Sequence, residues 1–154
     1  MAASLPPEVA AYLAEHNVMT LATLGTDGPW ASAVFYAVDG GALVFLSSPA
    51  TRHARNLEHD SRCAAAIQDD TADWKAVKGI QFEGRVVRLA GDEATAAHRC
   101  YAKKFPIVSP LAIVPPAIVE ALAKICWYRL TPSRLYFIDN ARGFGHRDEV
   151  DLDQ

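Results

Sequence analysis

The residues best suited to chemistry lie in the segment Ser47–Leu57, which reads SSPATRHARNL. Its pattern predicts a helix that carries Arg52, His53 and Arg55 near its start and no acidic residue before Glu58. A cation there costs about 0.3–1 kcal/mol, because the first amides of a helix are unpaired and positive. A bound anion would reverse that balance, since free amides, hydroxyls and an arginine together hold a phosphate. The segment therefore indicates a phosphate site, with cations that lie in solvent or pair with nearby acids as the alternative.

The other reactive residue types are scattered along the chain. Five histidines and three cysteines show no metal-ligand spacing, so the sequence predicts no metal site. Cys63, Cys100 and Cys126 are far apart and odd in number, which argues against a disulfide framework and for a reducing cytoplasm. No pair of a nucleophile and a base stands out, and neither does a pair of carboxylates.

Length and composition set limits on the class of protein. At 154 residues the chain is the size of one domain, and we expect a single domain over residues 1–154. The net charge of −3 and the absence of a basic run give no reason to expect nucleic acid as a partner. No apolar run reaches the ~20 residues that cross a bilayer, and no secretory signal is visible, so we expect no membrane contact and a cytoplasmic protein.

Turn residues divide the chain into alternating strands and a few helices. Short turns between the first three strands predict an antiparallel meander, and Val77–Leu89 alternates as a half-buried strand should. The fold class expected is α+β, an antiparallel β-barrel of about six strands with flanking helices. The predicted strands are Val18–Leu24, Trp30–Val38, Ala42–Ser47, Arg62–Gln68, Val77–Leu89 and Ile125–Ile138, the last broken near Thr131-Pro132; helices are predicted from Pro6 to His16, from Ser48 (N-cap) to His59, from Asp92 to Lys104 and from Pro115.

Several short motifs follow one another in a characteristic order between Tyr12 and Arg147. They are Met19–Thr23 followed by Asp27-Gly28, the strand ending Val44–Ser47, the helix Thr51–Leu57, Glu83–Val86, and the tail Phe137–Asn140 with Gly143–Gly145. In this order and spacing the chain resembles the pyridoxamine 5′-phosphate oxidase-like family of FMN-binding split barrels. The tail resembles that of its small, single-domain YhbP-like branch. The resemblance implies a split barrel that binds FMN.

The resemblance also implies which residues hold the cofactor. The family's phosphate ligands fall on Ser47, Thr51, Arg52 and His53, with His53 in place of the usual lysine. The family's second strand lies along the isoalloxazine ring, and small side chains would allow that close approach. The residues placed along the ring are Ala31, Ser32, Ala33, Val34, Phe35 and Tyr36.

The family implies a homodimer with the cofactor site at the subunit interface. The second chain would then contribute Gln81, the loop around Trp74 and the C-terminal segment Gly143, Phe144 and Gly145. Two glycines around an aromatic residue allow a tight turn over a ring. For Trp74 a surface loop with one packed ring is an equal alternative, and a simple C-terminal turn is the alternative for Gly143–Gly145.

Departures from the family pattern bear on the reaction. Pyridoxamine phosphate oxidase carries a glutamine at the position of Gly79 and a tryptophan at the position of Ile138. The arginine–histidine pair near the C-terminus of that enzyme has only a loose counterpart in His146-Arg147 of this chain. We therefore expect an FMN-dependent oxidoreductase that is not an authentic pyridoxamine phosphate oxidase, with a nicotinamide or a small reduced substrate as donor. A flavin needs no catalytic pair, because it carries the hydride itself. The alternatives are a non-catalytic carrier or sensor of FMN, deazaflavin or haem, and a barrel without ligand.

Overall fold

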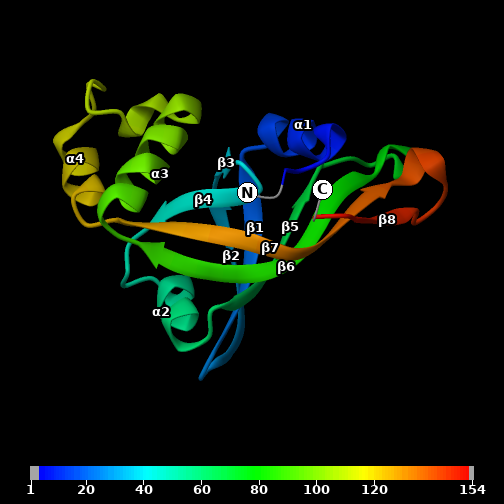
Figure 1. The fold of residues 1–154 in the computed structure, drawn as a ribbon, viewed down its shortest axis with the longest axis horizontal. Helices are drawn as coiled ribbons and strands as arrows, with labels where there is room; N and C mark the ends of the chain where they lie inside the picture. Colours follow the sequence, from blue (N-terminus) through cyan, green and yellow to red (C-terminus); the bar gives the residue numbers. More distant parts are fainter. Residues whose placement is uncertain (1–3, 153–154) are drawn as a thin grey trace.

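A curled antiparallel sheet organises the chain in the computed structural model, which describes residues 4–152 (Figure 1). Neighbouring strands follow the order β2-β1-β5-β6-β7-β4-β3, and β8 pairs with β7. The strands are β1 (Val18–Gly25), β2 (Gly28–Phe35), β3 (Ala37–Asp39), β4 (Ala42–Ser47), β5 (Arg62–Gln68), β6 (Lys78–Leu89), β7 (Cys126–Asp139) and β8 (Arg147–Val150). The helices are α1 (Pro7–Glu15), α2 (Arg52–His59), α3 (Gly91–Lys104) and α4 (Pro116–Leu122), with short 3-10 turns η1 (Trp74–Ala76), η2 (Pro106–Val108) and η3 (Asn140–Arg142). The expected α+β split barrel is confirmed.

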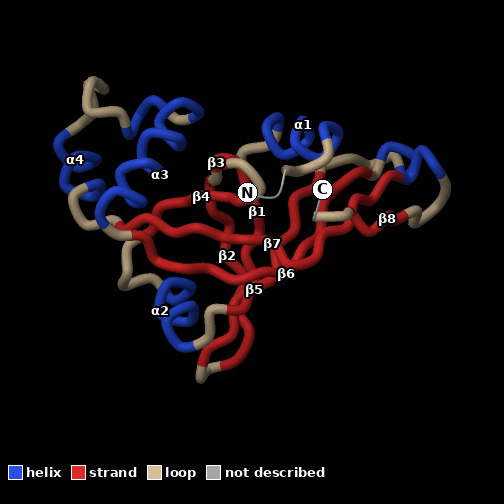
Figure 2. The backbone as a smooth tube through the Cα atoms, in the orientation of Figure 1, coloured by secondary structure: helices blue, strands red, loops and turns tan. Residues whose placement is uncertain are grey.

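The core follows from strand alternation. Along β6, Ile80, Phe82 and Val86 are buried, whereas Gln81 and Glu83 are exposed, as the period of two predicts. Inward residues of β1, β4, β5 and β7 complete one apolar cluster, and α1 packs its own apolar face against it. A second, smaller cluster lies beneath α3. Figure 2 shows that α3 and α4 gather at one end of the long strands β6 and β7, with β8 at the other end.

The predicted strand Trp30–Val38 is divided in two by Tyr36. Its ring is fully buried, its hydroxyl donates to the Leu13 carbonyl (2.7 Å), and its amide donates to the Asn17 carbonyl (3.1 Å). On either side of this anchor, β2 pairs with β1 and β3 pairs with β4. Both predicted antiparallel pairings are confirmed, but they use different halves of the predicted strand, so β2 and β3 lie at opposite ends of the strand order and no continuous three-strand meander forms.

The C-terminal third differs from the prediction in two ways. β7 is continuous from Cys126 to Asp139, and the predicted break at Thr131-Pro132 is instead a register shift against Gly84 on β6. A Cβ atom at Gly84 would lie 2.3 Å from the Thr131 carbonyl oxygen, so the irregularity needs glycine. β8 was not expected, because its residues Arg-Asp-Glu-Val carry no apolar alternation.

Replacing Gly84 tests this packing. Gly84→Ala should lower the free energy of unfolding by about 1–3 kcal/mol, because the added methyl meets backbone rather than a movable side chain. The urea midpoint of unfolding measures it. A midpoint equal to that of the wild type would contradict the close approach of β6 and β7.

Candidate functional site

The candidate phosphate site begins with the cap of helix α2. Thr51 is the N-cap: its side-chain oxygen accepts a hydrogen bond from the Ala54 amide (3.3 Å) and its hydroxyl donates to the Ser48 carbonyl (2.9 Å). The prediction of Ser48 as N-cap is wrong by three residues. Ser48 instead stabilises the preceding turn, where its hydroxyl accepts from the Ala50 amide (3.2 Å). The cap therefore places Arg52 and His53 in the first helical turn.

Three of the four predicted phosphate ligands are in hydrogen-bond contact. Ser47, the last residue of β4, is buried, and its Oγ lies 3.1 Å from the Thr51 Oγ1 and 2.7 Å from the His53 Nε2. Burial lowers the pKa of His53 below its ordinary value of 6.5, because it disfavours the charged imidazolium. At neutral pH the cluster therefore consists of two hydroxyls and a neutral imidazole.

Arg52, the fourth predicted ligand, lies on the same helix turn. Its guanidinium carbon is 4.3 Å from the centre of the Trp30 ring, and one of its amino groups is 3.5 Å from the Asp27 carbonyl. Within residues 4–152 Arg52 forms no ion pair with a carboxylate, and the first turn of α2 contains no acid. The start of α2 is therefore positive, with no negative side chain in its own first turn.

Strand β2, predicted to lie along a flavin ring, is an end strand of the sheet. In the described part of the chain it pairs only with β1, so the backbone groups on its other side are outside the strand ladder. Ala31 and Ala33 are exposed, Ser32 is half-buried and Val34 is buried. The Arg52–Trp30 contact joins β2 to the start of α2. One chain thus places a candidate phosphate cradle beside an open, small-residue strand edge.

The predicted residues of the C-terminal half lie elsewhere. Trp74 in η1 and Phe144 after η3 are 52% and 84% exposed, with ring centres 5.7 Å apart. Phe144 follows Asp139, the last residue of β7, and Trp74 precedes Lys78, the register partner of Asp139, whereas Ser47 pairs with Cys126 at the other end of β7. In Figure 1 the β8 hairpin and α2 accordingly lie at different ends of the molecule. The structure does not bring these rings to the cradle of the same chain.

Gln81 lies on the outer face of β6, in a shallow groove of about 370 Å³. Its side-chain oxygen accepts a hydrogen bond from Arg147 on β8 (3.4 Å). The floor of the groove consists of small side chains from β1 and β5, namely Thr20, Ala22, Ala64 and Ala66. Sequence reasoning missed the Arg147 contact because β8 itself was not predicted.

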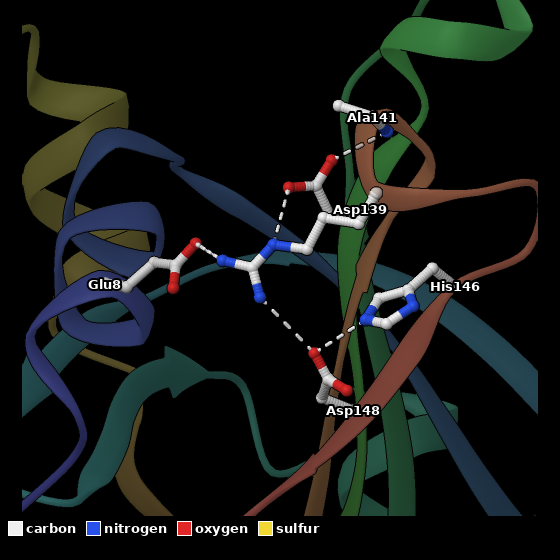
Figure 3. Close-up of polar contacts among 6 residues, drawn as sticks. Glu8, Asp139, Ala141, His146 and Asp148 are labelled. Atoms are coloured by element: carbon white, nitrogen blue, oxygen red, sulfur yellow. Dashed lines mark hydrogen bonds and ion pairs between the residues drawn. The ribbon is translucent and has the colours of Figure 1, made fainter.

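Sequence reasoning also missed an ionic cluster that fixes the C-terminal turn. The guanidinium of Arg142 lies 3.5 Å from Glu8 on α1, 3.7 Å from Asp139 and 3.5 Å from Asp148 (Figure 3). His146 Nε2 approaches Asp148 to 2.9 Å. The cluster joins the turn between β7 and β8 to the first helix. Nothing in the sequence marks it, since Glu8 and Arg142 are far apart along the chain.

Within residues 4–152, no group of three or more histidine, cysteine or acidic side chains is arranged to hold a metal ion. No described helix is long and apolar enough to cross a membrane.

A curled antiparallel sheet with a capped, cation-bearing helix after β4 defines this protein as a split barrel of the pyridoxamine 5′-phosphate oxidase-like type. Residues 5–139 match the family described as pyridoxamine 5′-phosphate oxidase. The chain belongs to this pyridoxamine 5′-phosphate oxidase-like family, as its sequence resemblance predicts.

Relatives of similar length include UPF0306 proteins. A UPF0306 protein of Photorhabdus laumondii is 30% identical over 138 residues, which covers 88% of this chain and 88% of the relative. The UPF0306 protein YhbP of Escherichia coli O157:H7 is 26% identical over 141 residues, which covers 90% of this chain and 88% of the relative. The resemblance to the YhbP-like branch is thereby confirmed.

Solved structures with this fold include haem proteins. A haem-binding protein of Mycobacterium smegmatis superposes with a TM-score of 0.70 at 31% identity over 91% of this chain, which spans 55% of that longer protein. The haem storage protein HutZ of Vibrio cholerae superposes with a TM-score of 0.68 at 22% identity, over 86% of this chain and 93% of HutZ. The second similarity shows the fold alone.

The lowered pKa of His53 predicts a pH dependence of stability. In the unfolded chain His53 binds a proton near its ordinary pKa of 6.5, whereas in the folded chain it binds a proton only at lower pH. The free energy of unfolding should therefore fall as the pH drops below that value. His53→Gln removes this contribution, so the loss of stability between about pH 8 and about pH 5.5 should be smaller in the variant. Urea unfolding at both pH values measures the difference, and equal losses would contradict a buried, neutral His53.

Proposed function

We propose that this chain is an FMN-binding protein that acts as a flavin-dependent oxidoreductase. The observation that carries the proposal is the positive start of α2, where Arg52 has no carboxylate partner among the described residues, directly beside the open edge of β2. A phosphate is the ligand that such a start favours, and a ring system linked to it would reach β2. Membership of the family supports FMN as the ligand, since the resemblance implies a split barrel that binds FMN.

The residues present fit a phosphate monoester. The amides of Arg52 and His53 form no hydrogen bond within the described residues, because the residues four positions before them lie outside the helix and offer no helical carbonyl. Ser47 and Thr51 add hydroxyl groups, and Arg52 adds a charge-assisted donor. His53 is neutral in the free protein, and a phosphate dianion nearby would favour its protonation. The group thus gains positive charge where the ligand brings negative charge.

The ring system of FMN fits the edge of β2. Ala31 and Ala33 leave the backbone accessible, and the backbone amides and carbonyls of an end strand can bond to a flat polar edge. FMN, when bound, supplies hydride and electron transfer, while the chain supplies position and electrostatics. The described residues hold the phosphate at one end, and β2 orients the ring. The electron donor we propose is a nicotinamide or a small reduced substrate.

The substrate differs from that of pyridoxamine phosphate oxidase. That enzyme's glutamine and tryptophan, as the resemblance implies, fall on Gly79 and Ile138 of this chain. These two residues are register partners on β6 and β7. At this one place in the sheet, the chain therefore lacks both the polar and the aromatic side chain with which the enzyme would recognise its substrate. The proposal is a related oxidoreductase with another substrate.

A second subunit completes the proposed site. Trp74, Gln81 and Phe144 are exposed, and their hydrogen-bond and ring contacts are made with residues other than the four of the cradle. A two-fold axis would carry one chain's C-terminal half to the other chain's cradle. The small-residue groove around Gln81 offers a flat face for such contact. We therefore propose a homodimer with the cofactor between the subunits.

Haem is a second candidate, favoured by the 31% identical haem-binding protein of M. smegmatis. Haem iron needs an axial ligand from the protein, most often a histidine. In residues 4–152, four histidine rings are engaged in hydrogen bonds, those of His16, His53, His98 and His146. His59 has no such bond, but it is the last residue of α2, at the opposite end from the cradle. Hydroxyl and arginine donors suit a phosphate better, so FMN is the preferred ligand. Protein offered FMN and haem together should show flavin absorption bands; a Soret band without flavin bands would make haem the preferred ligand.

Removing the arginine tests the cradle. Arg52→Ala should weaken FMN binding by about 1.5–3 kcal/mol, roughly 10- to 150-fold, because one charge-assisted ligand is lost. The melting temperature of the FMN-free protein should not fall, since a cation leaves a helix N-terminus. Fluorescence titration of apo wild type and variant measures affinity, with Arg55→Ala as the matched control on the same helix. Unchanged FMN affinity in Arg52→Ala would contradict the site.

Sedimentation tests the shared site. The chain with FMN should sediment as a homodimer at micromolar concentrations, and removal of FMN should shift it toward monomer by mass action. A bound cofactor of this size is normally covered over most of its surface, which one barrel edge does not provide. Sedimentation velocity of holo and apo protein at several concentrations gives the two distributions. A monomer that retains FMN would contradict every role proposed for the second chain.

A further inference from the structure

Asn140 joins two loops at the end of the sheet farthest from the cradle. Its side-chain nitrogen Nδ2 donates to the Trp74 carbonyl in η1 (2.7 Å), and its Oδ1 accepts from the Gly145 amide (3.1 Å). Its backbone amide donates to the Val77 carbonyl (2.9 Å). The residue is 9% exposed, so these bonds are made largely away from water. Asn140 thus bridges the loop after β5 and the turn before β8.

Asparagine is chemically specific at this position. One partner is a carbonyl that needs a donor, and the other is an amide that needs an acceptor, so the orientation of the side-chain amide is fixed by its surroundings. An aspartate of the same size could accept from Gly145, but it would face the Trp74 carbonyl with a second acceptor. Loss of a bond to a buried group of this kind costs more than loss of an exposed one.

The bridge holds two exposed aromatic rings together. Trp74 and Phe144 meet edge to face with ring centres 5.7 Å apart, yet they remain 52% and 84% exposed. Phe144 lies between Gly143 and Gly145, whose φ angles of 144° and 70° shape the turn that presents its ring. Apolar rings held this far out of the core form a surface on which another planar group can stack.

We propose that Asn140 is a positioning residue that locks Trp74 and Phe144 into one stacking surface for the ring system of the FMN held by the partner subunit. The ligand rests on the function proposed above, whereas the locking rests on the three hydrogen bonds of Asn140 alone. The partner's FMN is the occupant because the cradle of the same chain follows Ser47, which pairs with the first residue of β7, whereas the two rings lie beyond the last residue of β7. Lys75, whose Nζ lies 5.6 Å from the Trp74 ring centre, adds a cation at the rim.

Proteolysis tests the locking without any cofactor. Trypsin can cut after Lys75, which lies in η1 directly after Trp74. Asn140→Asp and Asn140→Ala should each speed this cleavage about tenfold, because the loop opens more often once a bridging bond is lost. Val108→Ala, in the cluster beneath α3, is the control that lowers stability without touching either loop. Cleavage equal to the wild type, or equal acceleration in the control, would overturn the locking.

FMN titration tests the stacking surface. Trp74→Ala and Asn140→Asp should each weaken FMN binding about tenfold. In the background Trp74→Ala/Phe144→Ala, adding Asn140→Asp should weaken binding no further, because the lock then has no ring left to place. Additive losses, as a general structural defect would give, overturn the positioning role. If the wild-type chain binds no FMN, the proposed function and this ligand fail together, whereas the cleavage rates still decide whether Asn140 locks the loops. If a soluble aromatic donor instead of FMN shows the dependence on Asn140, the surface binds substrate and the proposed occupant is wrong.

Discussion

The positive start of helix α2 is the constraint on which the proposed site depends. A helix stabilised only for its own sake would place acids in its first turn, as α3 does with Asp92 and Glu93. α2 places Arg52 and His53 there and has no acid in that turn. The Thr51 cap satisfies one amide, and the stacking of Arg52 on Trp30 holds the guanidinium in place without neutralising it. An anion bound at the proposed site would recover the free energy that the empty helix gives up.

The sheet gives this helix terminus its surroundings. β4 ends in Ser47, and the short turn that follows brings the Thr51 cap within hydrogen-bond distance of the Ser47 hydroxyl (3.1 Å). The division of the second strand at Tyr36 leaves β2 at one end of the strand order, next to α2. Had β2 run on as a meander into β3 and β4, a neighbouring strand would have taken up its second edge. A buried tyrosine thereby helps to create the open edge on which the proposed flavin ring would lie.

Sequence reasoning was most successful where local signals agree. Arg62–Gln68 is a strand between turn residues, and the alternation of Val77–Leu89 gives its buried face correctly. The break at Tyr36 could not be predicted, because it depends on a hydrogen bond to Leu13 in another element. Ser48 and Thr51 are both good caps, and tertiary packing decides between them.

The missed features of the C-terminal half share one cause. β8 consists mostly of charged residues and is held by pairing with β7 rather than by its own pattern. The bond from Asn140 to Trp74 joins residues 66 positions apart. The cradle residues were brought together as predicted, whereas Trp74, Gln81 and Phe144 were not, and a second subunit is the arrangement that would unite them.

The central claim is that the ligand is anchored by its phosphate. The most direct measurement compares FMN with riboflavin, which has the same ring but no phosphate, in fluorescence titrations of the apo protein at one ionic strength. FMN should bind at least about tenfold more tightly, because the amides of α2, Thr51 and Arg52 gain nothing from an uncharged ribityl end. Equal affinities for the two flavins would contradict a phosphate site at the start of α2.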